Sequence, residues 1–192
     1  MADAIQARIE EKRLGATLVL SGLDISVAAG EFVAVTGPSG VGKSTLLGLL
    51  AGLDRRFCGR IETVGRIGMV FQDPRLLPWR SAAANIALAA PDLEAGAIDA
   101  ALTAVGLAGQ GGLYPRQMSL GMARRVALAR ALAVAPDILL LDEPFVSLDA
   151  ASADLVRGVV RAYWHSRNPA VVMVTHDAAE AETLAGRVIR LG

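Results

Sequence analysis

Hydrophobic residues occur along this chain in short continuous runs, which alternate with longer amphipathic or alanine-rich segments. The continuous runs are typical of strands buried on both faces of a parallel sheet, and Phe32–Thr36 and Ile138–Leu141 are the clearest of them. Further strands are expected at Ile5–Glu10, Leu23–Ala28, Ile61–Val64, Arg66–Phe71, Val171–Thr175 and Arg187–Leu191. Helices are expected at Gly42–Leu50, Leu120–Ala133, Ala150–His165 and from Ala178 onward. Strands and helices that alternate in this way predict an α/β domain.

The pattern changes between Pro74 and Gln117, where prolines, glycines and alanine-rich stretches replace the apolar runs. Two helices are expected in this part, at Ala82–Ala90 and Ile98–Val105. The segment therefore predicts a small helical insertion into the α/β domain.

The composition supports a single core and excludes two kinds of partner or bond. A length of 192 residues with 53% apolar side chains is ample for the core of one domain. A formal net charge of zero argues against a nucleic-acid partner, because such surfaces carry a basic excess. Cys58 is the only cysteine, so the chain can form neither an internal disulfide nor a thiolate metal cluster.

The beginning of the chain alternates charges without an apolar core, and we expect no signal peptide there. No segment approaches the roughly 20 apolar residues that a membrane helix needs. We therefore expect a soluble, cytoplasmic protein.

A glycine-rich turn follows the predicted strand Phe32–Thr36 and opens the next helix, and it fits the pattern G-x-x-x-x-G-K-[ST]. Its residues are Gly37, Pro38, Ser39, Gly40, Val41, Gly42, Lys43, Ser44 and Thr45. Such a turn wraps backbone N–H groups around phosphate oxygens at a helix N-terminus. We expect Lys43 to reach the β- and γ-phosphates of ATP and Ser44 to bind Mg²⁺.

The predicted strand Ile138–Leu141 ends in two carboxylates, Asp142 and Glu143. Ligands of α/β domains bind at the carboxyl edge of the sheet, where these side chains are delivered. Asp142 is placed to hold Mg²⁺ through water, and Glu143 to act on the attacking water as a general base or by orienting it.

Over nearly its full length the chain resembles the nucleotide-binding subunit of an ATP-binding cassette (ABC) transporter. Four further motifs carry this resemblance in the family's order. They are Gln72 at the end of a strand, Ser119–Met122 (S-L-G-M) as the signature loop, Ser147–Asp149 (S-L-D) as the D-loop, and His176 as the switch histidine. The resemblance implies that Gln72 senses Mg²⁺ and the attacking water, and that His176 contacts the γ-phosphate.

The resemblance also implies the fold and its divisions. It is an α/β fold with a P-loop NTPase (RecA-like) core, an N-terminal antiparallel β part and an inserted α-helical subdomain. Residues 1–192 then form a single ABC ATPase domain, with the core at 1–73 and 124–192. Residues 74–123 form the helical subdomain with the signature motif.

The residue types of the signature loop suit a helix start. Ser119 can cap the helix that begins at Leu120, and the positive N-terminal end of that helix then faces outward. In the family, this helix end binds the ATP that the opposite subunit holds. Ser119, Gly121, Met122 and Asp149 are therefore expected to contact the partner's ATP. The resemblance implies a head-to-tail homodimer, or a pair with a second ATPase subunit.

Two departures from the family pattern stand out. The usual signature L-S-G-G-Q reads M-S-L-G-M here, with Leu120 in place of a glycine and Met122 in place of glutamine. No aromatic residue precedes Phe32, although the family stacks an aromatic ring on adenine near Arg13–Leu14. Base selectivity is then expected to be weak or to come from aliphatic packing.

The segment Pro74–Trp79 resembles importer subunits for nitrate, sulfonates, taurine and related small molecules. The implied function is the ATP-hydrolysing motor of such an importer, peripheral on the inner face of the membrane through transmembrane permease subunits and served by a solute-binding protein. Trp79 fits equally a packing aromatic of the core and a contact to the permease. The chain reaches Gly192 soon after the last expected strand, so no regulatory C-terminal domain is expected.

Two other functions explain part of the sequence pattern. A non-transport ABC ATPase, acting as an ATP-gated interaction switch, usually has two cassettes or a coiled-coil insertion, and neither is present. A small-molecule kinase or GTPase shares the phosphate loop but would not explain Ser119–Met122, Asp149 and His176 together. A GTPase would also need an N-K-x-D motif, which is absent.

Overall fold

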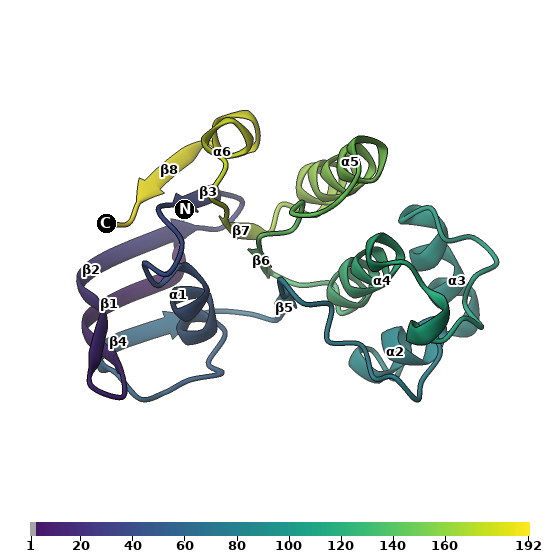
Figure 1. Cartoon of the computed structure of the whole chain (residues 1–192), viewed down its shortest axis with the longest axis horizontal. Helices are drawn as coiled ribbons and strands as arrows, with labels where there is room; N and C mark the ends of the chain where they lie inside the picture. The colour runs from purple at the N-terminus through teal and green to yellow at the C-terminus, as the bar shows by residue number, and fades with distance from the viewer. Residues whose placement is uncertain (1–2) are drawn as a thin grey trace. The chain divides into compact units, whose positions relative to one another are not determined.

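The computed structural model of the chain describes residues 3–192 and is shown in Figure 1. Met1 and Ala2, the first residues of the predicted domain, lie outside the described residues. By the packing of the backbone the chain divides into two compact units. The first unit contains the described residues up to Met69, together with Asp137–Glu143 and Arg167–Gly192. The second contains Val70–Pro136 and Pro144–Ser166.

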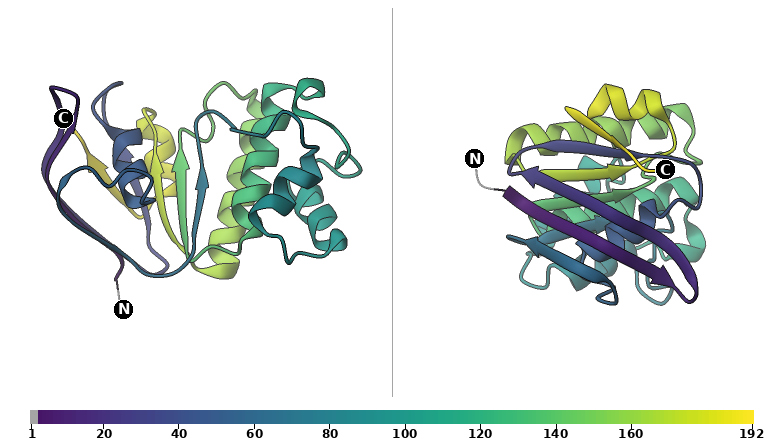
Figure 2. Two further views of the ribbon diagram at one scale, coloured as in Figure 1. Left: turned by 90° about the horizontal axis from the view of Figure 1, so that it is seen from below. Right: turned by 90° about the vertical axis from the view of Figure 1, so that its left-hand side faces the viewer.

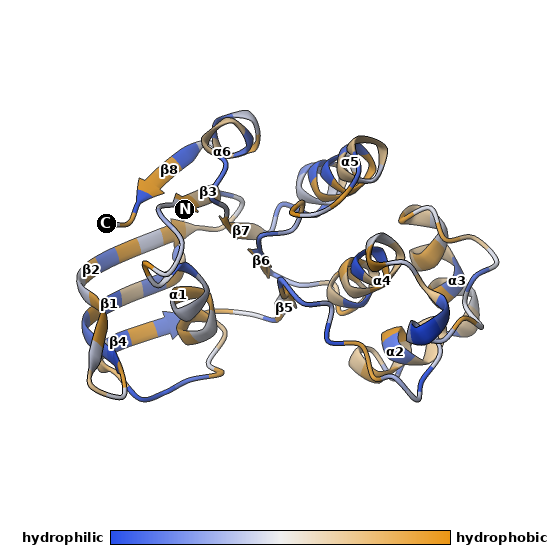
Figure 3. Ribbon diagram, in the orientation of Figure 1, coloured by the Kyte–Doolittle hydropathy of each residue, from blue (hydrophilic) through white to orange (hydrophobic). Residues whose placement is uncertain are grey.

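The first unit begins with an antiparallel sheet in the order β2-β1-β4, formed by Asp3–Leu14 (β1), Thr17–Ala28 (β2) and Cys58–Thr63 (β4). Its strands lie side by side in Figure 2, and Ile5 pairs with Val27 on one side and Thr63 on the other. Polar and apolar residues alternate along these strands (Figure 3). Such alternation is expected of a sheet with one face in the core and one in water.

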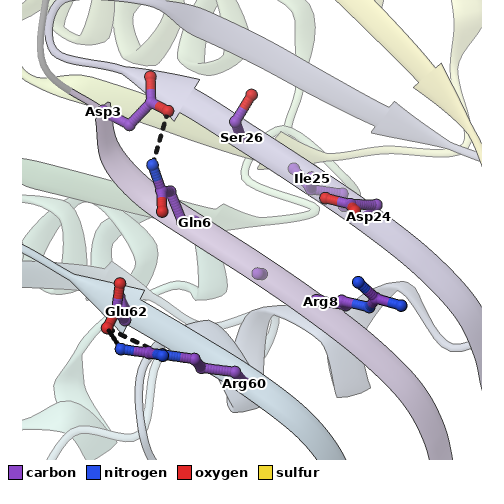
Figure 4. Close-up of a pocket in the computed structure, with 9 residues that line it drawn as sticks. Asp3, Gln6, Arg8, Asp24, Ile25, Ser26, Arg60 and Glu62 are labelled. Atoms are coloured by element: carbon purple, nitrogen blue, oxygen red, sulfur yellow. Dashed lines mark hydrogen bonds and ion pairs between the residues drawn. The ribbon is translucent and has the colours of Figure 1, made fainter.

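The solvent face of this sheet carries a polar hollow of about 440 Å³ (Figure 4). Side chains of its lining bind one another: Arg60 pairs with Glu62, and the amide of Gln6 donates to Asp3 over 3.0 Å. The hollow is best explained as a solvated sheet face.

A parallel sheet follows in the order β5-β6-β7-β3-β8. Its strands are Phe32–Thr36 (β3), Ile67–Val70 (β5), Ile138–Asp142 (β6), Ala170–Val174 (β7) and Arg187–Arg190 (β8). Every residue of β3, β6 and β7 is buried, which is why these strands read as unbroken apolar runs. The helices Lys43–Leu50 (α1) and Ala178–Leu184 (α6) also belong to this unit, and the leucines of α1 enter the core.

The second unit is helical, with Ala82–Ala89 (α2), Ala95–Ala104 (α3), Leu120–Ala133 (α4) and Ala150–Arg167 (α5). A short 3-10 turn at Pro115–Gln117, which the sequence did not predict, precedes α4. Helix α4 packs against both α2 and α3. None of the helices in residues 3–192 is both long and apolar enough to cross a bilayer.

Asn85 organises the loop before α2. It is fully buried, and its amide donates to the carbonyls of Leu77, Arg80 and Ser81 while its oxygen accepts from Leu77 N–H over 2.8 Å. A buried amide with every donor and acceptor used fixes a loop that has no regular structure. Asn85 therefore fixes the backbone of residues 77–81, the last part of the loop that follows Pro74.

The predicted α/β class and the antiparallel N-terminal part are confirmed. The limits of Phe32–Thr36 and Leu120–Ala133 agree with the prediction, whereas β1 and β2 are each about twice as long as expected. The compact units place residues 124–136 and 144–166 with the helices, and the predicted subdomain limits at 74 and 123 stay a prediction.

An ion pair between a buried lysine and a partly exposed aspartate in the first unit gives a prediction about acid stability. Lys12 is only 1% exposed, and its ammonium group donates to Asp54 over 2.6 Å and to the Arg56 carbonyl over 2.8 Å. The hydrogen bond from Lys12 lowers the pKa of Asp54 to about 2. The folded pKa lies below the unfolded value of about 4, so this stabilisation is complete above that value and is lost as the pH falls toward 2.

Replacing Asp54 with asparagine should therefore lower the melting temperature at neutral pH, because Lys12 stays buried without its carboxylate. The difference from the wild type should shrink as the pH falls from about 5 to about 2. Thermal melts followed by circular dichroism at stepped pH would measure it, with the exposed Asp92→Asn as control. A difference that stays constant over this range would contradict the assignment.

Candidate functional site

The glycine-rich turn between β3 and α1 has a backbone that only glycine tolerates at two positions. Gly37 has a φ of 153°, and a Cβ there would lie 2.4 Å from the carbonyl oxygen of Leu191. Gly42 has a φ of 107°, and a Cβ there would lie 2.8 Å from side-chain carbons of Val19 and Leu20. The turn is therefore shaped by close contact with its surroundings as well as by its own conformation.

Helix α1 begins directly after this turn, with Gly42 as its N-cap and no side chain capping it. Its first N–H groups are thus left to a ligand rather than to a side-chain oxygen. Lys43 is 7% exposed and donates to the carbonyls of Gly37 and Pro38 over 2.7 and 3.0 Å. Its ammonium group is held over the turn, where a phosphate would lie.

Ser44 and Asp142 come together from α1 and the end of β6. The Ser44 hydroxyl donates to Oδ1 of Asp142 over 2.9 Å, although 98 residues separate them. Ser44 is exposed, whereas Asp142 is 6% exposed. A hydroxyl and a carboxylate at this spacing are the hard oxygen donors that Mg²⁺ takes when substrate phosphates and waters complete its octahedron. The two side chains fit that ion.

Glu143 leaves β6 with a left-handed backbone (φ 48°), which is unusual for a residue with a side chain. Its N–H donates to the Val174 carbonyl over 3.0 Å, and this bond to β7 holds the conformation. Such strain costs about 1–3 kcal/mol and is concentrated at functional positions.

His176 follows β7, and its Nδ1 lies 2.6 Å from Oε2 of Glu143. The Glu143 side chain is only 11% exposed, whereas that of His176 is 56% exposed. The carboxylate is therefore shielded on one side by a ring that still reaches solvent. The first unit thus contains Lys43, Ser44, Asp142, Glu143 and His176, and their binding and catalytic roles stay a prediction.

The other predicted residues belong to the second unit. Gln72 is exposed in the loop after β5. The Ser119 hydroxyl accepts from Met122 N–H over 3.2 Å and caps α4, which confirms its predicted capping role. The Cβ position of Gly121 lies 3.6 Å from the Leu148 side chain, so the signature loop and the D-loop are neighbours within this unit.

Asp149 caps α5, because its carboxylate accepts from the N–H and the hydroxyl of Ser152 over 2.9 and 2.8 Å. These hydrogen bonds lower the pKa of Asp149. A contact between Asp149 and a partner's ATP stays a prediction, and the aspartate has a local structural role beside it.

Two further expectations concern exposed apolar residues. Trp79 is 70% exposed, so its interpretation as a core aromatic is wrong. Leu14 and Leu18, which flank the β1–β2 turn, are 52% and 47% exposed. Leu18 and Val19 are consecutive in β2, and Val19 lies against the phosphate-binding turn at Gly42, so Leu18 offers aliphatic surface near that turn.

The sequence reasoning missed the arginines of α4. Arg124, Arg125 and Arg130 each donate to main-chain carbonyls of neighbouring segments. The sequence does place these charged residues on a helix that is expected to pack against the domain. A partly buried arginine there needs hydrogen-bond acceptors, and this could have indicated their role.

Comparison with known proteins agrees with this geometry. A family model described as "ABC transporter" matches residues 20–146. The chain is 47% identical over 188 residues to the aliphatic sulfonates import ATP-binding protein SsuB 2 of Pseudomonas savastanoi pv. phaseolicola, covering 97% of this chain and 70% of the relative. It is 46% identical over 196 residues to the SsuB protein of Mycobacterium sp., covering 99% and 80%.

Among solved structures, the chain is similar to the ATP-binding cassette MJ0796 in a dimeric post-hydrolysis state bound to ADP and Pi. The TM-score is 0.88 at 27% identity, and the match covers 97% of this chain and 94% of that one.

Proposed function

The chain belongs to the ABC transporter family as one of its ATPase subunits, and we propose that it drives an importer of aliphatic sulfonates. The observation that carries the substrate class is the identity of 46–47% to relatives named for sulfonate import, which extends over nearly the whole chain. Five residues of the first unit support the hydrolytic role, because each supplies a group that phosphoryl transfer needs. They are Lys43, Ser44, Asp142, Glu143 and His176.

We propose that the glycine-rich turn and the N-terminus of α1 bind the phosphates of ATP. Lys43 would exchange the carbonyls of Gly37 and Pro38 for phosphate oxygens, which offer it a full negative charge instead of two dipoles. Ser44 and Asp142 would hold Mg²⁺, and Gln72 is the proposed third protein group. Mg²⁺, when bound, neutralises phosphate charge.

Glu143 is proposed to accept a proton from the attacking water as the water oxygen bonds to the γ-phosphorus. The bond from that phosphorus to the bridging oxygen breaks, and ADP and phosphate leave. His176 would orient the carboxylate through the 2.6 Å contact and face the γ-phosphate with its exposed edge. A shielded carboxylate that is held by one partner is suited to orient a single water.

Two copies of the chain are proposed to pack head to tail, as a homodimer or with a paired ATPase subunit. The capped start of α4 would present Ser119, Gly121 and Met122 to the ATP of the partner, with Asp149 beside them. The N-terminus of a helix favours an anionic ligand through its remaining N–H groups and its dipole, which supports this assignment. ATP binding would close the dimer, and hydrolysis would open it.

The remaining partners are proposed to be transmembrane permease subunits and a solute-binding protein. Attachment to the permease would place the chain peripherally on the inner, cytoplasmic face of the membrane. The exposed Trp79 supports such a contact, because a solvent-exposed indole is unusual away from interaction surfaces.

The experiment is reconstitution of the chain with the permease subunits and the solute-binding protein of a sulfonate importer. ATP hydrolysis in these proteoliposomes should rise several-fold when the binding protein is loaded with an alkanesulfonate. An alkyl carboxylate of the same length is the matched control and should have no effect. Stimulation by the carboxylate alone would contradict the sulfonate assignment, whereas hydrolysis that ignores the permease would favour a non-transport switch.

A further inference from the structure

The loop that carries Gln72 is fastened to helix α4 by an arginine. Nη1 of Arg130 donates to the Arg75 carbonyl over 2.9 Å, and Nη2 donates to the Pro74 carbonyl over 2.8 Å. The two donors are the two ends of one planar fork, so they fix both the position and the direction of the chain between residues 74 and 75. The loop is thus held two residues after Gln72.

The setting of Arg130 makes this contact costly to lose. The Arg130 side chain is partly buried, and this burial lowers the pKa of its guanidinium. A charge removed from water needs acceptors, and Arg130 finds two of them in this loop. The loop carbonyls therefore satisfy the Arg130 guanidinium of α4, and the same two hydrogen bonds fix the loop.

A second arginine of α4 lies at Gln72 itself. Nη2 of Arg124 is 3.5 Å from the Gln72 carbonyl oxygen. Its Nε and Nη1 are buried without a hydrogen-bond partner among the described residues. Nearby Asp73 partly offsets the burial that lowers the pKa of Arg124. The loop thus approaches α4 at residue 72 as well as at residues 74 and 75.

The loop is also closed on itself. The guanidinium of Arg75 lies over the Phe71 ring, 4.1 Å from its centroid, and Arg75 has a left-handed backbone (φ 47°). Pro74 is buried, whereas Gln72 and Asp73 are exposed. Gln72 therefore lies on a short loop whose two ends, Phe71 and Arg75, are in contact and whose C-terminal end is fixed by Arg130.

We propose that Arg130 is a positioning residue for Gln72, which makes the glutamine loop and the signature helix move as one body. When α4 shifts, the fork on Pro74 and Arg75 carries Gln72 with it. The same movement would set the distance of Gln72 from the ATP held by this chain and the distance of Ser119 from the ATP held by the partner. This inference rests on the proposed function and names a residue that none of the sequence motifs contains.

The test is a double-mutant cycle on the rate constant of ATP hydrolysis by the whole chain, using Arg130→Lys and Gln72→Ala. Lysine keeps the charge and the aliphatic stem but cannot span two carbonyls as a fork. Arg130→Lys should lower kcat about tenfold with KM for ATP nearly unchanged, because a small displacement of a positioned group has effects of this size. In the Gln72→Ala background the same change should lower kcat by less than about twofold.

A merely structural role for Arg130 would lower kcat by the same factor in both backgrounds, and that result would overturn the proposal. A wild-type rate in Arg130→Lys would overturn it as well. Arg161→Lys, on the exposed surface of α5, is the matched control and should change neither rate. If the wild-type chain itself fails to hydrolyse ATP, the proposed function falls first and this inference falls with it.

Discussion

Replacing Glu143 with glutamine is expected to lower the rate of ATP hydrolysis by about a thousandfold, within the range attributed to general acid–base groups. Glutamine has the same shape as glutamate but cannot accept a proton from water. The affinity for ATP should stay unchanged or increase, because Lys43 and the start of α1 are untouched and one negative charge near the phosphates is removed. Single-turnover hydrolysis and binding of a fluorescent ATP analogue would measure the two effects separately.

The same variant should accumulate as a dimer with ATP and Mg²⁺, because closure no longer leads to hydrolysis. Gel filtration would show the change in size, and it should reverse when ATP is withdrawn. The matched control is Glu182→Gln, an exposed carboxylate on α6 in the same unit. Turnover at the wild-type rate in Glu143→Gln would remove Glu143 from the mechanism.

Much of the first unit could be predicted from the sequence, because its central strands are buried on both faces. Phe32–Val35 and Ile138–Leu141 have no polar interruption, so these apolar runs mark the strands β3 and β6 almost to the residue. The groups that follow them, the glycine-rich turn and the carboxylates, are then fixed at the carboxyl edge by topology alone. This is why Ser44 and Asp142 could be paired across 98 residues.

What the sequence could not predict depends on contacts between distant segments. The predicted β1 is too short because many of its residues are polar and face water. Lys12 can be buried because its ammonium group donates a hydrogen bond to Asp54. The left-handed backbone of Glu143 is held by a bond to Val174, and no local pattern predicts it. Arg130 has the same explanation, since its role depends on two carbonyls 55 and 56 residues away.

Changing Ser119 to glutamate is expected to abolish ATP-driven dimerisation while ATP binding by the single chain stays intact. A carboxylate at the start of a helix suits the helix dipole, so α4 should keep its structure. The same carboxylate would face the γ-phosphate of the partner's ATP, and juxtaposed like charges cost several kcal/mol, or about a hundredfold or more in the dimer constant. The measurement is analytical ultracentrifugation with ATP and Mg²⁺ in the Glu143→Gln background.

Two controls separate charge from size and position. Ser119→Gln has the shape of the glutamate variant without its charge, and it should retain most of the dimer. Ser81→Glu introduces the same charge at another helix start of the same unit, where Ser81 caps α2 by accepting from Ala84 N–H over 3.3 Å, and it should dimerise normally. Dimerisation that persists in Ser119→Glu would mean that the start of α4 does not face a phosphate. The two-chain site would then have to be built from other groups.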